Sequence, residues 1–209
     1  MSETLRIAVA DDEPHMRAYL SESLMELGHE VVAAVSNGRD LVSSCRSLQP
    51  DLILTDIKMP DMDGIEAAVE VCRQSPVPVV LLSAYHDPAT ICRTEAGCVM
   101  AYLVKPIGDA DLGPAITVAM HRFRELDAAR TEAAALRKTL EDRKVIERAK
   151  GLLMKIAGLD EHAAYQRLQS LASVKSKKLV DVALMVLDVE SALEPRNSGA
   201  KPGPARPEE

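Results

Sequence analysis

Polar side chains stand directly after four apolar runs in the first half of the chain. They are Asp11 and Asp12, Asp56, Ser83 and Lys105. If each run is a strand of one parallel sheet, the carboxyl ends of the strands meet at one edge, where open α/β sheets bind their ligands. Neighbouring strands lie about 4.8 Å apart, so we expect these five side chains to converge on one site.

Three carboxylates at such a site repel one another and need a cation among them. A set of oxygen ligands without His or Cys favours Mg²⁺. The carboxylate of Asp56 can then act as a nucleophile toward phosphorus, while the Lys105 ammonium and the Ser83 hydroxyl contact the transferred phosphoryl group. Taken singly, Asp56 is also compatible with a turn or helix-capping residue, and Lys105 with a solvated surface lysine.

Short apolar segments alternate with segments of helical spacing in the first 120 residues. The segments predicted as strands are residues 5–10, 31–35, 52–54, 77–82 and 99–104. Helices are expected between them, including one from near Pro88 to Gly97 and another after Asp109. The uniformly apolar run 52–54 indicates a central strand that is covered on both faces. This alternation predicts a doubly wound parallel α/β sheet with right-handed crossovers.

Residues 1–118, which we expect to form one domain, resemble the receiver domain of bacterial two-component response regulators in these motifs. The resemblance implies a flavodoxin-like, five-stranded parallel sheet with strand order 2-1-3-4-5. It also implies that a sensor histidine kinase phosphorylates Asp56. Mg²⁺ would be held by Asp56 together with Asp11, Asp12 and the backbone carbonyl of Lys58.

The same resemblance gives three further residues a role in switching or catalysis. Ser83 corresponds to the hydroxyl switch residue of the family, Tyr102 to its aromatic switch residue, and Lys105 to its phosphoryl-contacting lysine. The dipeptide Lys105-Pro106 corresponds to one usually joined by a cis bond. Tyr102 is also compatible with a half-buried strand residue that keeps its polar tip in water.

Charge is distributed unevenly along the 209 residues. The formal net charge is −7, yet residues 143–178 hold nine basic residues against three acidic ones, which predicts different partners for the two halves. Four cysteines without CxxC spacing favour buried thiols in a reducing cytoplasm over disulfides or a zinc site. We find no export signal and no membrane span, and therefore expect a cytoplasmic protein.

Residues 119–142 are expected to form a helical linker, since neither Gly nor Pro interrupts them. Small and apolar residues recur there at heptad positions: Ala119, Leu126, Ala129, Ala133, Leu136 and Leu140. The pattern is typical of a thin coiled-coil seam and fits a homodimer formed on phosphorylation. It is also compatible with a continuous helix packed on its own domain.

Residues 143–192 carry three helical signals and are predicted to form a small all-α domain. The apolar face expected for the first helix comprises Ile146, Ala149, Leu153 and Ile156. Asp160 is expected to cap the second helix and Ser176 the third. Such a small core is expected to pack against the linker or a second subunit. The tail, residues 193–209, is rich in Pro, Gly and charge and is predicted to be disordered.

This module, beginning RKVIERAKGLLMKIAG, resembles an ANTAR domain, the RNA-binding output module of transcription antitermination regulators. The resemblance implies a target of paired RNA hairpins and control of antitermination or translation. Unpaired loop bases stack on aromatic or arginine side chains, and phosphates pair with basic ones. The predicted RNA contacts are Arg143, Lys144, Arg148, Lys150 and Tyr165. A merely solvated basic face, and a core position for Tyr165, stay open as alternatives.

Two other functions are compatible with the sequence. The helical module could bind DNA as part of a transcription factor, although no bihelical unit with a recognition helix stands out. The first domain could be an aspartyl-nucleophile phosphohydrolase. Such an enzyme requires a second aspartate as general acid and base two residues after the nucleophile, where this chain has Lys58. We therefore expect a phosphorylation-controlled regulator rather than an enzyme.

Overall fold

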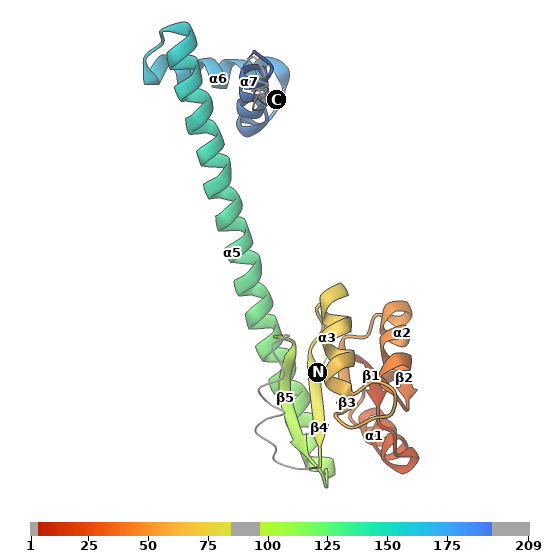
Figure 1. The fold of residues 1–209 in the computed structure, drawn as a ribbon. Helices are drawn as coiled ribbons and strands as arrows, with labels where there is room; N and C mark the ends of the chain where they lie inside the picture. The colour runs from red at the N-terminus through yellow and green to blue at the C-terminus, as the bar shows by residue number, and fades with distance from the viewer. Residues whose placement is uncertain (1–3, 85–96, 194–209) are drawn as a thin grey trace, which may run out of the picture. The chain divides into compact units, whose positions relative to one another are not determined.

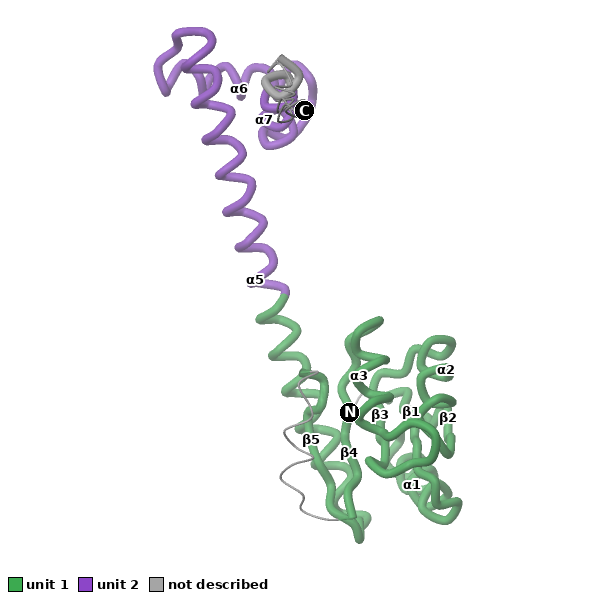
Figure 2. Tube along the Cα trace, viewed as in Figure 1, with its two compact units in different colours: residues 1–130 green, residues 131–209 purple. Residues whose placement is uncertain are grey.

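The computed structural model describes residues 4–84 and 97–193 (Figure 1). The chain divides into two compact units, residues 1–130 and 131–209, which we describe separately (Figure 2). Two predictions lie outside the described residues. They are most of the helix expected from Pro88 to Gly97, and the disordered tail beyond Leu193.

A five-stranded sheet forms the centre of the first unit, in the order β2-β1-β3-β4-β5. All four neighbouring pairs are parallel. The strands are β1 Arg6–Ala10, β2 Glu30–Val35, β3 Leu52–Asp56, β4 Val79–Ser83 and β5 Val99–Val104. The flavodoxin-like order is therefore confirmed. β4 begins at Val79 rather than Val77, because Pro78 has no N–H to donate to the ladder.

Helices pack on both faces of this sheet, and each face has its own apolar core. The helices of the first unit are α1 Pro14–Glu26, α2 Gly38–Leu48, α3 Gly64–Gln74 and the beginning of α5 Asp109–Ala157. Ile7 and Val9 of β1 pack into the core that includes residues of α1 and α5. Ala8 and Ala10 pack into the core that includes residues of α2 and α3. This alternation along one strand buries the central strands on both sides, as predicted.

Side-chain caps fix where α2 and α3 begin. The side chain of Asn37 accepts a hydrogen bond from the N–H of Asp40, and the side chain of Asp63 accepts one from the N–H of Glu66. The N–H of Gly64, the first residue of α3, donates to the carbonyl of Ile57 at 2.9 Å. These bonds hold the first turn of α3 against the loop that follows β3.

The second unit contains the end of α5, then α6 Glu161–Lys175 and α7 Leu179–Leu193. Asp160 caps α6 through the N–H of Ala163 at 2.7 Å, as predicted. Ser176 does not cap α7. Its φ of 51° places it in the left-handed region, where it ends α6 and its N–H bonds back to Ala172 and Ser173. The helix α7 therefore begins at Leu179, later than the sequence suggested.

The core of the second unit is small, and one residue of the apolar face expected on α5 is not buried in it. Ala149, Leu168, Val182 and Ala183 are buried together. Ile156 is 65% exposed, whereas Leu152 is buried. Ile156 lies in the last turn of α5 and stays largely exposed, so its apolar periodicity does not translate into burial.

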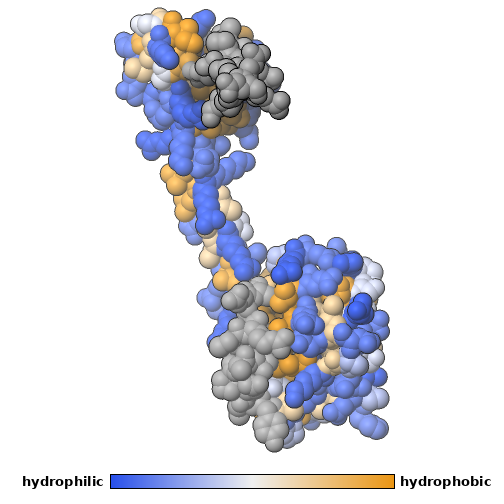
Figure 3. Space-filling model, in the orientation of Figure 1, coloured by the Kyte–Doolittle hydropathy of each residue, from blue (hydrophilic) through white to orange (hydrophobic). Residues whose placement is uncertain are grey.

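Among the heptad residues of α5, Ala119 is buried and the later ones are exposed. Ala119 is buried in the first unit, while Leu136 and Leu140 are 60% and 59% exposed. Every residue from 124 to 141 is exposed. Figure 3 shows apolar residues among polar ones along this part of the helix. Among the described helices none is long and apolar enough to cross a membrane.

Candidate functional site

Three carboxylates meet at the carboxyl edge of the sheet. Asp11 follows β1 directly and Asp56 is the last residue of β3, which pairs with β1. One carboxylate oxygen from each of Asp11, Asp12 and Asp56 lies within 4.8 Å of the others. Asp11 is fully buried, Asp56 is buried and Asp12 is exposed. The convergence expected from the strand ends is present for these three carboxylates.

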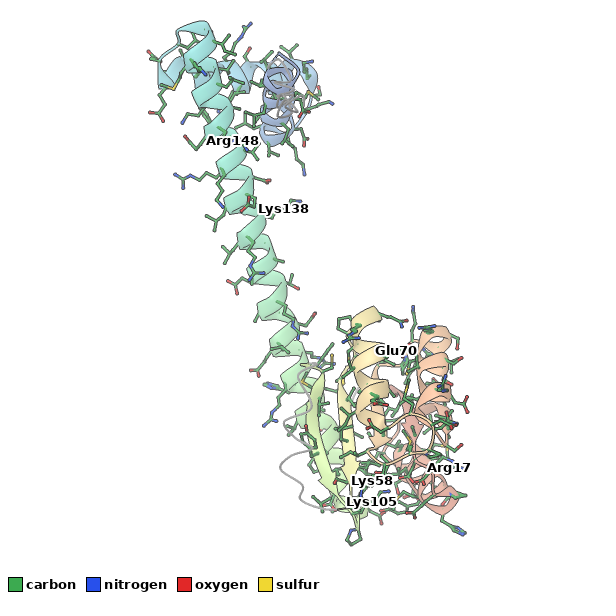
Figure 4. The ribbon with its side chains drawn as sticks, viewed as in Figure 1. Arg17, Lys58, Glu70, Lys105, Lys138 and Arg148 are labelled. Carbon is green, nitrogen blue, oxygen red and sulfur yellow. The ribbon has the colours of Figure 1, made fainter. Side chains whose placement is uncertain are left out.

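Lys105 bridges the two buried carboxylates. Its Nζ lies 2.8 Å from Oδ2 of Asp11 and 2.7 Å from Oδ2 of Asp56. Burial lowers the pKa of Lys105, but the hydrogen bonds to Asp11 and Asp56 raise it by more, so the net shift is upward. The ammonium is therefore fully charged at neutral pH. The peptide bond from Lys105 to Pro106 is cis, and Lys105 lies at the same end of the sheet as Lys58 (Figure 4).

Backbone groups and one arginine hold the carboxylates in place. The N–H of Glu13 donates to Oδ1 of Asp11 at 2.9 Å, and the N–H of Lys58 contacts Oδ1 of Asp56 at 3.4 Å. Nη1 of Arg17, on α1, donates to the carbonyls of Asp11 and Asp12 at 2.6 and 3.0 Å. Sequence reasoning missed Arg17, whose position one turn into the helix after the acidic pair is the signal that could have indicated it.

The site depends on the missing side chain of Gly64, the first residue of α3. A Cβ atom there would lie 1.9 Å from the carbonyl oxygen of Asp56 and 2.8 Å from Oγ1 of Thr55. Oγ1 of Thr55 itself donates to the carbonyl of Asp56 at 3.0 Å. The backbone at Asp56 is thus packed too closely against α3 to admit alanine without movement.

Ser83 lies on β4, which pairs with the strand of Asp56, and Tyr102 lies on β5, on the far side of β4. Ser83 ends β4, pairs with Val104 of β5 and is half-buried. The Ser83 carbonyl accepts the N–H of Lys105 at 2.8 Å, so the serine and the lysine are joined through the backbone. Tyr102 is half-buried and packs against the core on the α2 and α3 face.

The donor set fits a hard divalent cation. Its side-chain donors are carboxylate oxygens, one of them on a fully buried residue, and magnesium prefers oxygen ligands while thiols and imidazoles favour softer metals. The Lys105 ammonium supplies part of the positive charge that these carboxylates require.

Two family models match the chain. The response regulator receiver domain matches residues 7–117, and the ANTAR domain matches residues 134–187. The chain belongs to the response regulators. Its receiver domain lies in the first unit and its ANTAR domain in the second.

Individual relatives agree with this assignment. The transcriptional regulatory protein PdtaR of Mycobacterium tuberculosis is 40% identical over 183 residues, which cover 88% of this response regulator and 89% of PdtaR. Two solved structures are similar over the receiver domain. One is the receiver domain of NarL from M. tuberculosis, with a TM-score of 0.52, 28% identity and coverage of 56% and 95%. The other is the chemotaxis protein CheY4 of Vibrio cholerae, with a TM-score of 0.53, 26% identity and coverage of 56% and 99%.

The residues predicted to contact RNA are not equivalent in the ANTAR domain. Arg143 and Arg148 are exposed, and Lys144 is exposed with its Nζ 2.9 Å from Oε1 of Glu141. Tyr165 is 37% exposed, so it does not simply fill the core. Lys150 differs from the other basic residues, because only 7% of it is exposed.

Proposed function

We propose that phosphorylation of Asp56 by a sensor histidine kinase controls RNA binding by the ANTAR domain. The observation that carries the proposal is the carboxylate cluster at the strand ends with Lys105 bridging its two buried members. The family assignment supports the two halves of the scheme, a receiver and an output domain.

In the proposed reaction a carboxylate oxygen of Asp56 attacks phosphorus. An O–P bond forms and the N–P bond of the kinase phosphohistidine breaks. A proton carried by the other ring nitrogen of the phosphohistidine lets the imidazole leave as a neutral group. Asp11, Asp12 and Asp56, with the Lys58 carbonyl, would hold Mg²⁺, which when bound neutralises charge on the phosphoryl oxygens. The Lys105 ammonium and the Ser83 hydroxyl are proposed to contact the same oxygens.

Phosphorylation is proposed to redistribute the contacts of Lys105. The Lys105 ammonium, which now contacts the carboxylates of Asp11 and Asp56, would move to contact the phosphoryl oxygens. The Ser83 hydroxyl would turn toward the same oxygens. Tyr102, two residues before Val104 on β5, would then repack on its face of the strand. The change would reach the surface formed by β5 and the first turns of α5.

The phosphorylated protein is proposed to form a dimer that binds paired RNA hairpins. We place the boundary of the receiver at residue 118 and treat residues 119–142 as the dimerising linker, because its heptad leucines are exposed on the single chain. Two ANTAR domains held together would each raise the effective concentration of the other at the second hairpin. Binding would control transcription antitermination or translation, in line with the description of PdtaR as a transcriptional regulator.

Binding measurements with two nucleic acids test the proposal. The purified protein, with and without acetyl phosphate and Mg²⁺, is titrated with RNAs of two adjacent hairpins and with duplex DNA. RNA binding that strengthens on phosphorylation supports the proposal. Binding to DNA alone would make the protein a DNA-binding transcription factor. Steady hydrolysis of phosphoesters that Asp56→Asn abolishes would favour the phosphohydrolase.

A further inference from the structure

Lys150 lies between two glutamates on the surface of the ANTAR domain. Its Nζ donates to Oε1 and Oε2 of Glu147 at 3.1 and 3.0 Å, and to Oε1 of Glu161 at 2.7 Å. The Lys150 side chain is only 9% exposed. The bonds join the last part of α5 to the first residue of α6.

The charge of this cluster argues against a phosphate contact. One ammonium and two carboxylates give a local charge of about −1, which repels a phosphate. The hydrogen bond to Glu161 raises the pKa of Lys150, and the same bond lowers the pKa of Glu161. Lys150 and Glu161 are therefore charged at neutral pH. The three donor positions of the ammonium are already directed at carboxylate oxygens of Glu147 and Glu161.

Tyr165 completes the cluster on its exposed side. It lies one turn after Glu161 on α6, and its ring centroid is 6.0 Å from Nζ of Lys150, within the range of a cation–π contact. A surface pocket is lined by Lys150, Glu161, His162 and Tyr165. Only one carboxylate oxygen of Glu161, Oε1, accepts the hydrogen bond from Lys150. Because 71% of the Glu161 side chain is exposed, its carboxylate can accept further hydrogen bonds from a group in the pocket.

We propose that this pocket receives one unpaired RNA base, which stacks on Tyr165 and donates N–H groups to Glu161, while Lys150 positions both residues. The inference rests on the proposed RNA-binding function and assigns to Lys150 a role other than the phosphate contact predicted from the sequence. A carboxylate accepts hydrogen bonds from exocyclic amino groups. The pocket therefore favours adenine, cytosine or guanine over uracil, whose edge presents two carbonyls beside a single N–H.

The dependence of binding on salt separates a positioning residue from a phosphate contact. Affinity for a double-hairpin RNA is measured across a range of salt concentrations for the wild type, Lys150→Gln and the matched control Arg148→Gln. Loss of one phosphate contact reduces the slope of log K against log salt by roughly 0.7. We expect that reduction for Arg148→Gln. For Lys150→Gln we expect weaker binding with an unchanged slope.

Variants of the pocket residues test whether a base stacks on Tyr165 and bonds to Glu161. Tyr165→Phe keeps the ring and should bind like the wild type, whereas Tyr165→Leu should lose roughly 5- to 150-fold in affinity, the range expected for one base stacked on an aromatic ring. In the wild type, replacing one particular loop base by uracil should weaken binding, and Glu161→Gln should shrink that difference. Circular dichroism of each variant checks that the helices are retained.

The failure of this inference can be told apart from failure of the proposed function. If the wild-type protein binds no RNA, the proposed function is wrong and the pocket has no base to receive. If the wild type binds RNA but Lys150→Gln lowers the salt slope as Arg148→Gln does, Lys150 is a phosphate contact and the inference is overturned. Equal binding by Tyr165→Leu and the wild type would also overturn it.

Discussion

Replacing Lys105 by methionine removes the cation that bridges two buried carboxylates. The Asp11 side chain is fully buried and that of Asp56 is 11% exposed, and both contact Nζ at hydrogen-bonding distance. Removing one partner of such a buried pair costs about 3–5 kcal/mol, because the other charge stays without compensation. The variant can limit the loss by protonating one carboxylate, which for an ordinary aspartate costs about 4 kcal/mol at pH 7.

The pH dependence of that loss identifies its cause. A carboxylate that is protonated only in the folded variant releases its proton on unfolding, so the stability of the variant falls as pH rises. The loss relative to the wild type should be about 4 kcal/mol at pH 7 and about 1.5 kcal/mol at pH 5. Hydrogen exchange of peptides that cover β1 and β3, measured against urea, reports this stability for the receiver domain alone.

Two comparisons make the test decisive. Arg46→Met removes an ion pair to Glu70 whose side chains are 59% and 42% exposed, and it should cost less than about 1 kcal/mol without a trend in pH. Mg²⁺ should stabilise Lys105→Met more than the wild type, because the cation replaces the lost ammonium. A loss for Lys105→Met that matches Arg46→Met, or that does not change between pH 5 and pH 7, would refute the reasoning.

Three further predictions concern Gly64, the pKa of Lys105 and the exposed leucines of α5. Gly64→Ala should destabilise the receiver by about 1–3 kcal/mol, since a Cβ would meet the Asp56 carbonyl, and urea denaturation of the variant measures the loss; unchanged stability would mean that α3 moves freely. The raised pKa of Lys105 gives a stabilisation that is fully present below the pKa of an ordinary lysine and disappears as pH rises through the folded pKa. The wild type should therefore lose more receiver stability in strongly alkaline solution than Lys105→Met, and parallel curves would contradict the ion pairs. Leu136→Lys with Leu140→Lys should change the stability of the single chain by no more than about 0.5 kcal/mol, because both leucines are exposed, but should abolish dimerisation by the phosphorylated protein in sedimentation experiments; a dimer that survives would place the interface elsewhere.

The sequence was informative where a single local pattern decides the structure. Apolar runs flanked by Pro and Gly predict the strands, and the polar residue after each run predicts the edge at which Asp11, Asp56 and Lys105 meet. The strand order came from the resemblance to receiver domains, because alternation of strands and helices does not by itself decide which strands are neighbours.

Contacts between distant segments were not predictable in the same way. The approach of Gly64 to Asp56 depends on how α3 packs on the sheet. Lys150 was grouped with the exposed basic residues, since a charge count does not show that Glu161, on the next helix, is 2.7 Å away. Ile156 follows helical periodicity but is 65% exposed.

The central claim is that the phosphoryl group on Asp56 controls RNA binding, and one comparison tests it most directly. The affinity for a double-hairpin RNA is measured for the wild type and Asp56→Asn, each with Mg²⁺ and with or without acetyl phosphate, while mass spectrometry follows phosphorylation. We predict that acetyl phosphate phosphorylates only the wild type and strengthens only its binding. Equal strengthening of Asp56→Asn, or a wild type that is phosphorylated on Asp56 without any change in affinity, would contradict the account.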